Sequence, residues 1–152
     1  MASLIPNIRY FSILKRFPEL IHGMSTRKGG MSREPFSGLN LGLSTSDERQ
    51  DVEANRALLF RHLGIRPEEC VFPEQVHSDH VEVTMESGII KQTDAVITNK
   101  PNLFLTVQTA DCLPVFLYDA RFRVCGLVHS GWRGTAGNIV GKTVLKMQNT
   151  PY

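Results

Sequence analysis

The feature that most limits the fold of this chain is a pair of predicted strands. Each is followed by a polar segment that contains a residue type able to bind a metal. Residues 103–107 and 124–128 are apolar runs whose length is typical of buried strands. The first run precedes a turn that contains Cys112, and the second leads into the segment HSGWRG, which begins at His129. We therefore expect Cys112 and His129 to lie at or just past the ends of two strands.

A third candidate ligand follows another predicted strand, residues 71–76, which leads directly into His77. Two histidines and one cysteine on separate elements suit a zinc site with three protein ligands and an open fourth position, as in catalytic zinc sites. We predict that His77, Cys112 and His129 bind zinc. Copper is the alternative metal, because Cu(II) binds nitrogen and sulfur ligands more tightly than zinc does.

The same residues allow other chemistry. Cys112 could act as a nucleophile with His129 as its base, which would make the protein a metal-free thiol hydrolase. A copper-dependent oxidase with a single copper ion is a further alternative. A multicopper oxidase needs many imidazoles, typically in His-x-His pairs, and this chain has five histidines and no such pair. Cys125 lies inside an apolar run and is expected to be structural.

The rest of the chain alternates between helix and strand patterns. Apolar residues recur at helix spacing over residues 48–63, and Gly64 follows as a C-cap. Residues 27–40 are rich in glycine, serine and proline and predict a long loop. A second helix is predicted over residues 135–148. The expected strands cover residues 71–76, 81–84, 95–98, 103–107, 114–118 and 124–128.

Several of these strands follow one another with connections too short for helical crossovers, so the sheet is expected to be mixed rather than all-parallel. The chain has 152 residues and is 41% hydrophobic, which is enough for one globular domain with a real core. We therefore predict a single α/β domain over residues 1–152.

The net charge and the cysteines limit which binding partners and which cellular compartment are expected. A net charge of +2 with dispersed lysines and arginines favours neither nucleic acid nor an acidic membrane surface as a partner. The first residues lack the basic and long apolar segments of a signal peptide, and no apolar run is long enough to span a membrane. Three cysteines without a Cys-x-x-Cys pair suit reduced thiols. We expect a cytoplasmic protein.

Short segments along the chain resemble one family. They are HGMSTR at residues 22–27, GGMS at 29–32, LNLG at 39–42, NR at 55–56, QVH at 75–77, ADC at 110–112 and HSGWRG at 129–134. In this order they are similar to the polyphenol oxidase or laccase-domain family, whose members are described as purine nucleoside phosphorylases with adenosine deaminase activity. The likeness covers residues 21–144. The family extends well beyond this point, so we expect a chain truncated at its C-terminus.

The resemblance implies a mixed-sheet, multi-layer α/β sandwich and a zinc-dependent enzyme. The implied reactions are phosphorolysis of adenosine, inosine or methylthioadenosine and hydrolytic deamination of adenosine, with a purine nucleoside and phosphate as the small-molecule partners. Cys112, His129 and Asp111 are the candidate catalytic residues, and Asp111 is the nearest group for acid–base work. The candidates for binding substrate or phosphate are Arg27, Asn40 and Arg133.

The missing C-terminal part of the family leaves one alternative and one further expectation. The alternative is an inactive, binding-only homologue. The expectation is self-association, because uncovered apolar surface and open strand edges favour pairing with another chain.

Overall fold

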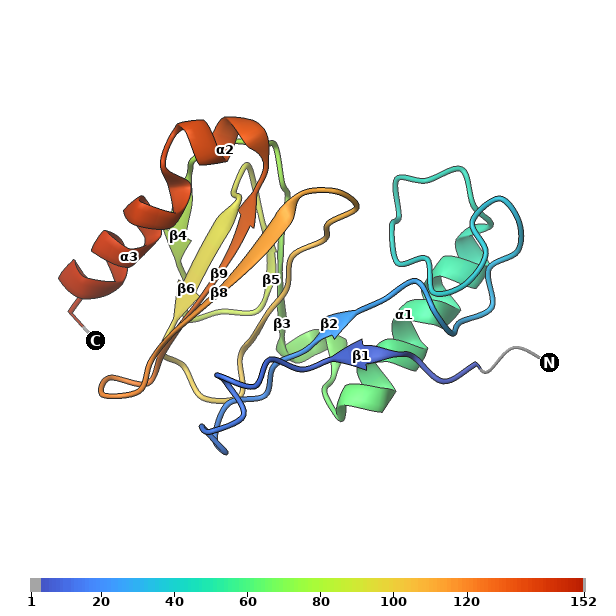
Figure 1. The fold of residues 1–152 in the computed structure, drawn as a ribbon, viewed down its shortest axis with the longest axis horizontal. Coiled ribbons are helices and arrows are strands. Elements are labelled where there is room, and N and C mark those ends of the chain that lie inside the picture. Colours follow the sequence, from blue (N-terminus) through green and yellow to red (C-terminus); the bar gives the residue numbers. More distant parts are fainter. Residues whose placement is uncertain (1–3, 152) are drawn as a thin grey trace. The chain divides into compact units, whose positions relative to one another are not determined.

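The computed structural model describes residues 4–151, and it divides the chain into two compact units, Met1–Arg66 and Pro67–Tyr152 (Figure 1). The predicted single domain over residues 1–152 stays a prediction. The signal-peptide argument rests partly on residues 1–3, which lie outside the described residues. No helix within residues 4–151 is long and apolar enough to cross a membrane.

The first unit contains one helix and one small sheet. β1 (Ile8–Arg9) and β2 (Met24–Ser25) pair antiparallel. Helix α1 (Arg49–Leu63) ends at Gly64, which adopts the left-handed conformation with φ 69°. This confirms the predicted helix and its glycine cap, since glycine takes up this conformation without the steric cost of a Cβ atom.

A buried asparagine of α1 holds the long loop of the first unit. Asn55 is fully buried, and its side-chain amide donates hydrogen bonds to the Ser32 hydroxyl and to the backbone carbonyls of Gly38 and Asn40. Its side-chain oxygen accepts the backbone N–H of Met31. Residues 27–40 therefore form a loop, as predicted, whose backbone polar groups are satisfied by a helix side chain.

The second unit contains a four-stranded mixed sheet in the order β4-β6-β9-β8 (Figure 1). β4 and β6 are parallel, whereas β6–β9 and β9–β8 are antiparallel pairs. This confirms the predicted mixed sheet. The strands are β4 (Val81–Val83), β6 (Ala95–Thr98), β8 (Leu113–Asp119) and β9 (Val124–Ser130).

A second, three-stranded sheet in this unit is all-parallel, in the order β5-β3-β7. Its strands are β3 (Cys70–Pro73), β5 (Gly88–Ile90) and β7 (Phe104–Leu105). The prediction missed β5, which is a short edge strand that begins at a glycine and exposes Ile89 to solvent. Two sheets and the helices together form the predicted layered α/β architecture.

Two strands are shorter than predicted. The strand expected over residues 71–76 ends at Pro73. The Glu74 N–H still donates to the Ile90 carbonyl of β5, but the N–H groups of Val76, His77 and Ser78 donate to the Asp94 carboxylate instead of a neighbouring strand. The strand expected over residues 103–107 is reduced to β7. Directly after it, the backbone N–H and the hydroxyl of Thr106 both donate hydrogen bonds to the Val71 carbonyl.

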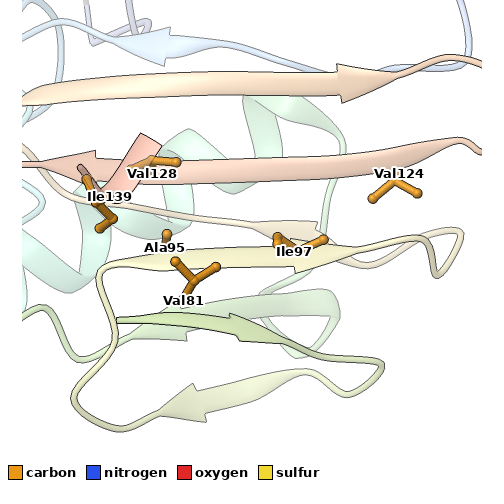
Figure 2. Close-up of a cluster of buried hydrophobic side chains, with 6 residues drawn as sticks. All are labelled: Val81, Ala95, Ile97, Val124, Val128 and Ile139. Atoms are coloured by element: carbon orange, nitrogen blue, oxygen red, sulfur yellow. The ribbon is translucent and has the colours of Figure 1, made fainter. Parts of the chain in front are cut away.

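The predicted helix over residues 135–148 is two helices. A five-residue helix, α2 (Trp132–Ala136), is followed by α3 (Ile139–Asn149), and the chain turns between them at Asn138, which has φ 59°. α3 packs against β4, β6 and β9. Figure 2 shows the core of this unit, in which the side chains of Val81, Ala95, Ile97, Val124, Val128 and Ile139 are buried.

The self-association predicted from the sequence stays a prediction. Within residues 4–151, β8 is hydrogen-bonded to another strand on one side only. Leu113 at its start and Leu145 on α3 are more than half exposed. Light scattering of the purified chain over a range of concentrations would measure whether it associates.

Candidate metal centre

Three of the predicted residues come together in the second unit. One ligand atom each from His77, Cys112 and His129 lie within 4.8 Å of one another. The rings of His77 and His129 meet edge to face, with their centroids 4.8 Å apart. His77 is exposed, Cys112 is half-buried and His129 is buried. The group is therefore closed on the His129 side and accessible on the His77 side, as an open ligand position requires.

The antiparallel pair of β8 and β9 brings two of these ligands together. His129 is the penultimate residue of β9, and Cys112 directly precedes β8. The register pairs Leu113 with Ser130, so Cys112 lies at the same end of the sheet as His129. The prediction that Cys112 follows the strand at residues 103–107 was wrong in one respect. β7 ends at Leu105, and β8 is the strand that positions the thiol.

Two glycines of the HSGWRG segment make room for the turn that carries His77. A Cβ atom on Gly131 would come within 2.8 Å of His77 Nδ1 and 3.4 Å of Cys112 Sγ. A Cβ atom on Gly134 would come within 2.7 Å of the Ser78 carbonyl oxygen. The glycines thus permit close approach rather than an unusual backbone, since Gly131 has φ −74° and ψ 170°.

A buried carboxylate that the sequence analysis missed lies behind the histidines. Asp94 Oδ1 is 2.7 Å from His129 Nδ1, and both side chains are buried. Burial alone would raise the pKa of Asp94, but hydrogen bonds from His129, Ser78 and Val76 outweigh it and hold that pKa below its ordinary value. Since Asp94 engages Nδ1, Nε2 is the ring nitrogen of His129 that is left for a ligand role.

A reciprocal amide contact joins the segments that lead to His77 and Cys112. The side chain of Gln75 donates to the Gln108 carbonyl at 2.7 Å and accepts the Gln108 N–H at 2.7 Å. Gln75 lies two residues before His77, and Gln108 lies four residues before Cys112. The glutamine therefore fixes the spacing of two ligand-bearing loops, each of which connects the three-stranded sheet to the four-stranded sheet.

Gln75→Ala is expected to weaken zinc binding about tenfold, because it removes two hydrogen bonds that restrain the ligand loops, each worth about 1 kcal/mol. A competition titration with a chromophoric chelator measures this. Gln148→Ala is the matched control, since Gln148 is an exposed residue of α3. Equal zinc affinity in the two variants would show that Gln75 does not restrain the site.

The thiol of Cys112 is not activated by its surroundings. Its Sγ atom is 3.7 Å from Asp111 Oδ1, and Asp111 is exposed. Burial, followed by the negative charge of Asp111, raises the pKa of Cys112 above its ordinary value. A nucleophilic cysteine needs the opposite shift, so this environment weighs against the metal-free thiol hydrolase. A cation bound at the sulfur would reverse the shift.

The predicted substrate residues have different surroundings. Arg133 lies on α2, exposed, with its guanidinium 4.5 Å from the ring centre of the exposed Trp132. Arg27 and Asn40 belong to the unit Met1–Arg66. Arg27 is exposed, and Asn40 donates hydrogen bonds to the side chains of Thr45 and Asp47. The substrate roles of Arg27, Asn40 and Arg133 stay predictions.

The helix predicted to begin at residue 135 begins earlier. The helix begins at Trp132, with Gly131 as its N-cap, and Gly134 lies inside it. His80 is 2.9 Å from Glu82 and does not belong to the group of three candidate ligands.

Comparison with known families and proteins agrees with the resemblance in the sequence. Residues 21–152 match the family model described as multi-copper polyphenol oxidoreductase laccase. The chain belongs to this family. It is 39% identical over 128 residues to a purine nucleoside phosphorylase of Corynebacterium glutamicum, covering 82% of this chain and 52% of the relative. It is also 39% identical over 138 residues to one of Deinococcus radiodurans, covering 90% and 54%.

Solved structures of the family share the fold. YlmD from Geobacillus stearothermophilus superimposes with a TM-score of 0.80 at 34% identity, covering 84% of this chain and 51% of YlmD. The hypothetical protein YfiH of Bacillus licheniformis gives a TM-score of 0.79 at 34% identity, with the same shares covered. The chain spans about half the length of the relatives that it matches.

The family description mentions several copper ions, and the site of this chain does not match that description. Among the described residues, His77, Cys112 and His129 are the one group of three or more potential ligands of this kind. A blue copper site together with a trinuclear cluster needs many more imidazoles than five histidines provide. The geometry supports one metal ion.

Proposed function

We propose that this chain carries the zinc centre of a purine nucleoside phosphorylase that also deaminates adenosine. The observation that carries the proposal is the convergence of His77, Cys112 and His129, whose ligand atoms lie within 4.8 Å of one another. The relatives named purine nucleoside phosphorylase supply the reaction class.

The donor set fits zinc. One thiolate and two imidazoles are among the ligands that zinc prefers, and three protein ligands leave a fourth position for substrate or water. Cu(II) would compete for the same atoms, so copper is the alternative metal. When bound, the metal would act as a Lewis acid toward a water molecule or the purine base.

The protein residues would hold the metal and move protons. The Asp94 carboxylate accepts a hydrogen bond from Nδ1 of His129, which directs Nε2 of that ring toward the other ligands. Both proposed reactions need a proton for the leaving group, which is the purine in phosphorolysis and ammonia in deamination. Asp111 is exposed beside Cys112, and we propose it as the group that transfers this proton.

Arg133 is proposed to bind phosphate, because an exposed guanidinium four residues after His129 suits bidentate contact with that anion. Arg133→Ala is expected to raise the apparent KM for phosphate about tenfold and to leave the KM for the nucleoside nearly unchanged. Arg121→Ala is the matched control, since Arg121 is also an exposed arginine over an aromatic ring, that of Phe122. Equal rises in both KM values would indicate a structural role for Arg133.

The proposal is tested by incubating the purified chain with adenosine and phosphate and measuring adenine, inosine, hypoxanthine and ammonia separately. Adenine that forms only with phosphate present indicates phosphorolysis, and ammonia equal to the sum of inosine and hypoxanthine indicates deamination. Both activities should disappear after chelation of the metal and return with added zinc. Activity that survives complete removal of metal would contradict the proposal and favour the Cys112–His129 thiol chemistry.

A further inference from the structure

One buried carboxylate contacts two of the three candidate ligands. Asp94 Oδ1 accepts a hydrogen bond from His129 Nδ1 at 2.7 Å and another from the His77 backbone N–H at 3.1 Å. Asp94 Oδ2 accepts the backbone N–H groups of Val76 and Ser78 at 3.2 and 2.7 Å, and the Ser78 hydroxyl at 2.7 Å. Both oxygens of this carboxylate therefore accept hydrogen bonds from the segments that carry His77 and His129.

The contact to His129 fixes the position and the tautomer of the ring. Asp94 Oδ1 is the acceptor of this contact, so Nδ1 carries the hydrogen and Nε2 keeps its lone pair. The His129 backbone N–H also donates to the Asp94 carbonyl, at 2.7 Å. A side-chain bond and a main-chain bond between the same two residues leave the imidazole little freedom to turn.

The contact to residues 76–78 fixes an unfavourable backbone. His77 has φ 58°, the left-handed region in which a residue with a side chain is disfavoured. Three successive N–H groups, those of Val76, His77 and Ser78, point at the Asp94 carboxylate. Such a concave row of amides binds an anion. The negative charge of Asp94 therefore stabilises the turn that presents the His77 side chain to Cys112 and His129.

We propose that Asp94 is a positioning residue of the metal centre, which holds His77 and His129 in ligand geometry at the same time. The inference rests on the proposed metal-binding function and adds to it a residue that restrains two of the ligands at once. Its basis is geometric: one carboxylate accepts hydrogen bonds from the side chain of one ligand and from the backbone of a second ligand.

Asp94→Asn tests this with almost no change in size. An asparagine keeps one oxygen for His129, but its amide nitrogen would face the N–H donors of Val76 and Ser78, and the charge is lost. We expect zinc to bind 10- to 100-fold more weakly, the usual range for loss of such a partner. Asp79→Asn is the matched control, because Asp79 lies in the same segment and pairs with Lys142 of α3.

Two readouts separate positioning from general stability. Zinc affinity is measured by competition with a chromophoric chelator on protein that circular dichroism shows to be folded. The absorption spectrum of the cobalt-substituted protein reports ligand geometry, and its visible bands should shift or weaken in Asp94→Asn and stay unchanged in Asp79→Asn. A purely structural Asp94 would lower the unfolding temperature without metal but leave zinc affinity and the cobalt spectrum as in the wild type.

If Asp94→Asn does not fold, Ser78→Ala carries the same test, since it removes the hydroxyl bond to Oδ2 and keeps the carboxylate. It also removes the exposed hydrogen bond from the His80 N–H to the same hydroxyl. Its zinc affinity should fall about threefold. Wild-type affinity in the folded variant would overturn the positioning role while leaving the proposed metal centre intact. A wild-type chain that binds no zinc would instead overturn the metal centre itself, and the positioning role with it.

Discussion

Cys112→Ala is expected to abolish most metal binding, from about one zinc per wild-type chain to almost none after dialysis. Removing one of three protein ligands should weaken binding by about 3 to 5 kcal/mol, which is more than a hundredfold. The thiol is half-buried beside the two histidines, and no other cysteine belongs to their group within the described residues. Elemental analysis of the purified protein measures the effect directly.

Cys125→Ala is the control for this prediction. Cys125 is a half-buried residue within β9, outside the group formed by the three candidate ligands. The variant should keep a full equivalent of zinc. Loss of metal from Cys125→Ala with full retention in Cys112→Ala would show that the ligand assignment is wrong.

Gly131→Ala is expected to weaken zinc binding strongly while leaving the protein folded. The new Cβ atom would come within 2.8 Å of His77 Nδ1, and the exposed His77 ring can turn away to relieve the overlap. Alanine accepts the φ and ψ angles at this position, so the free energy of unfolding should change by less than about 1 kcal/mol. Displacing a ligand should cost zinc affinity at least about tenfold.

Ser130→Ala is the neighbouring control for Gly131→Ala. The Ser130 hydroxyl is 2.8 Å from the Thr135 hydroxyl and takes no part in the ligand group. The Ser130→Ala variant should bind zinc as the wild type does. Chelator competition and thermal unfolding on both variants separate the two effects. A Gly131→Ala protein with unchanged zinc affinity would show that His77 is not held against this glycine when metal is bound.

The sequence singled out the three side chains that the structure brings together, because their residue types are chemically distinctive. Few side chains other than Cys112, His77 and His129 could bind a soft or borderline metal, and each follows a recognisable strand pattern. Asp94 gave no comparable signal, because an aspartate before a strand is an ordinary surface feature until its partners are known. Its role depends on a contact to His129, 35 residues away in the sequence.

The errors in the predicted fold have a similar origin. The sequence assigned Cys112 to the preceding strand, whereas antiparallel pairing with β9 places it at the start of β8. The continuous helix predicted over residues 135–148 breaks at Asn138, a residue type that tolerates the left-handed conformation, and its periodicity alone did not reveal the break. The first of these features is set by a strand partner distant in the sequence.

X-ray absorption at the zinc edge tests the central claim most directly. We expect the zinc-loaded chain to show one sulfur ligand at about 2.3 Å and nitrogen ligands at about 2.0–2.1 Å from two imidazoles. That result corresponds to one cysteine and two histidines, the set formed by Cys112, His77 and His129. A zinc environment with no sulfur ligand, or with two or more, would contradict the assignment of this centre.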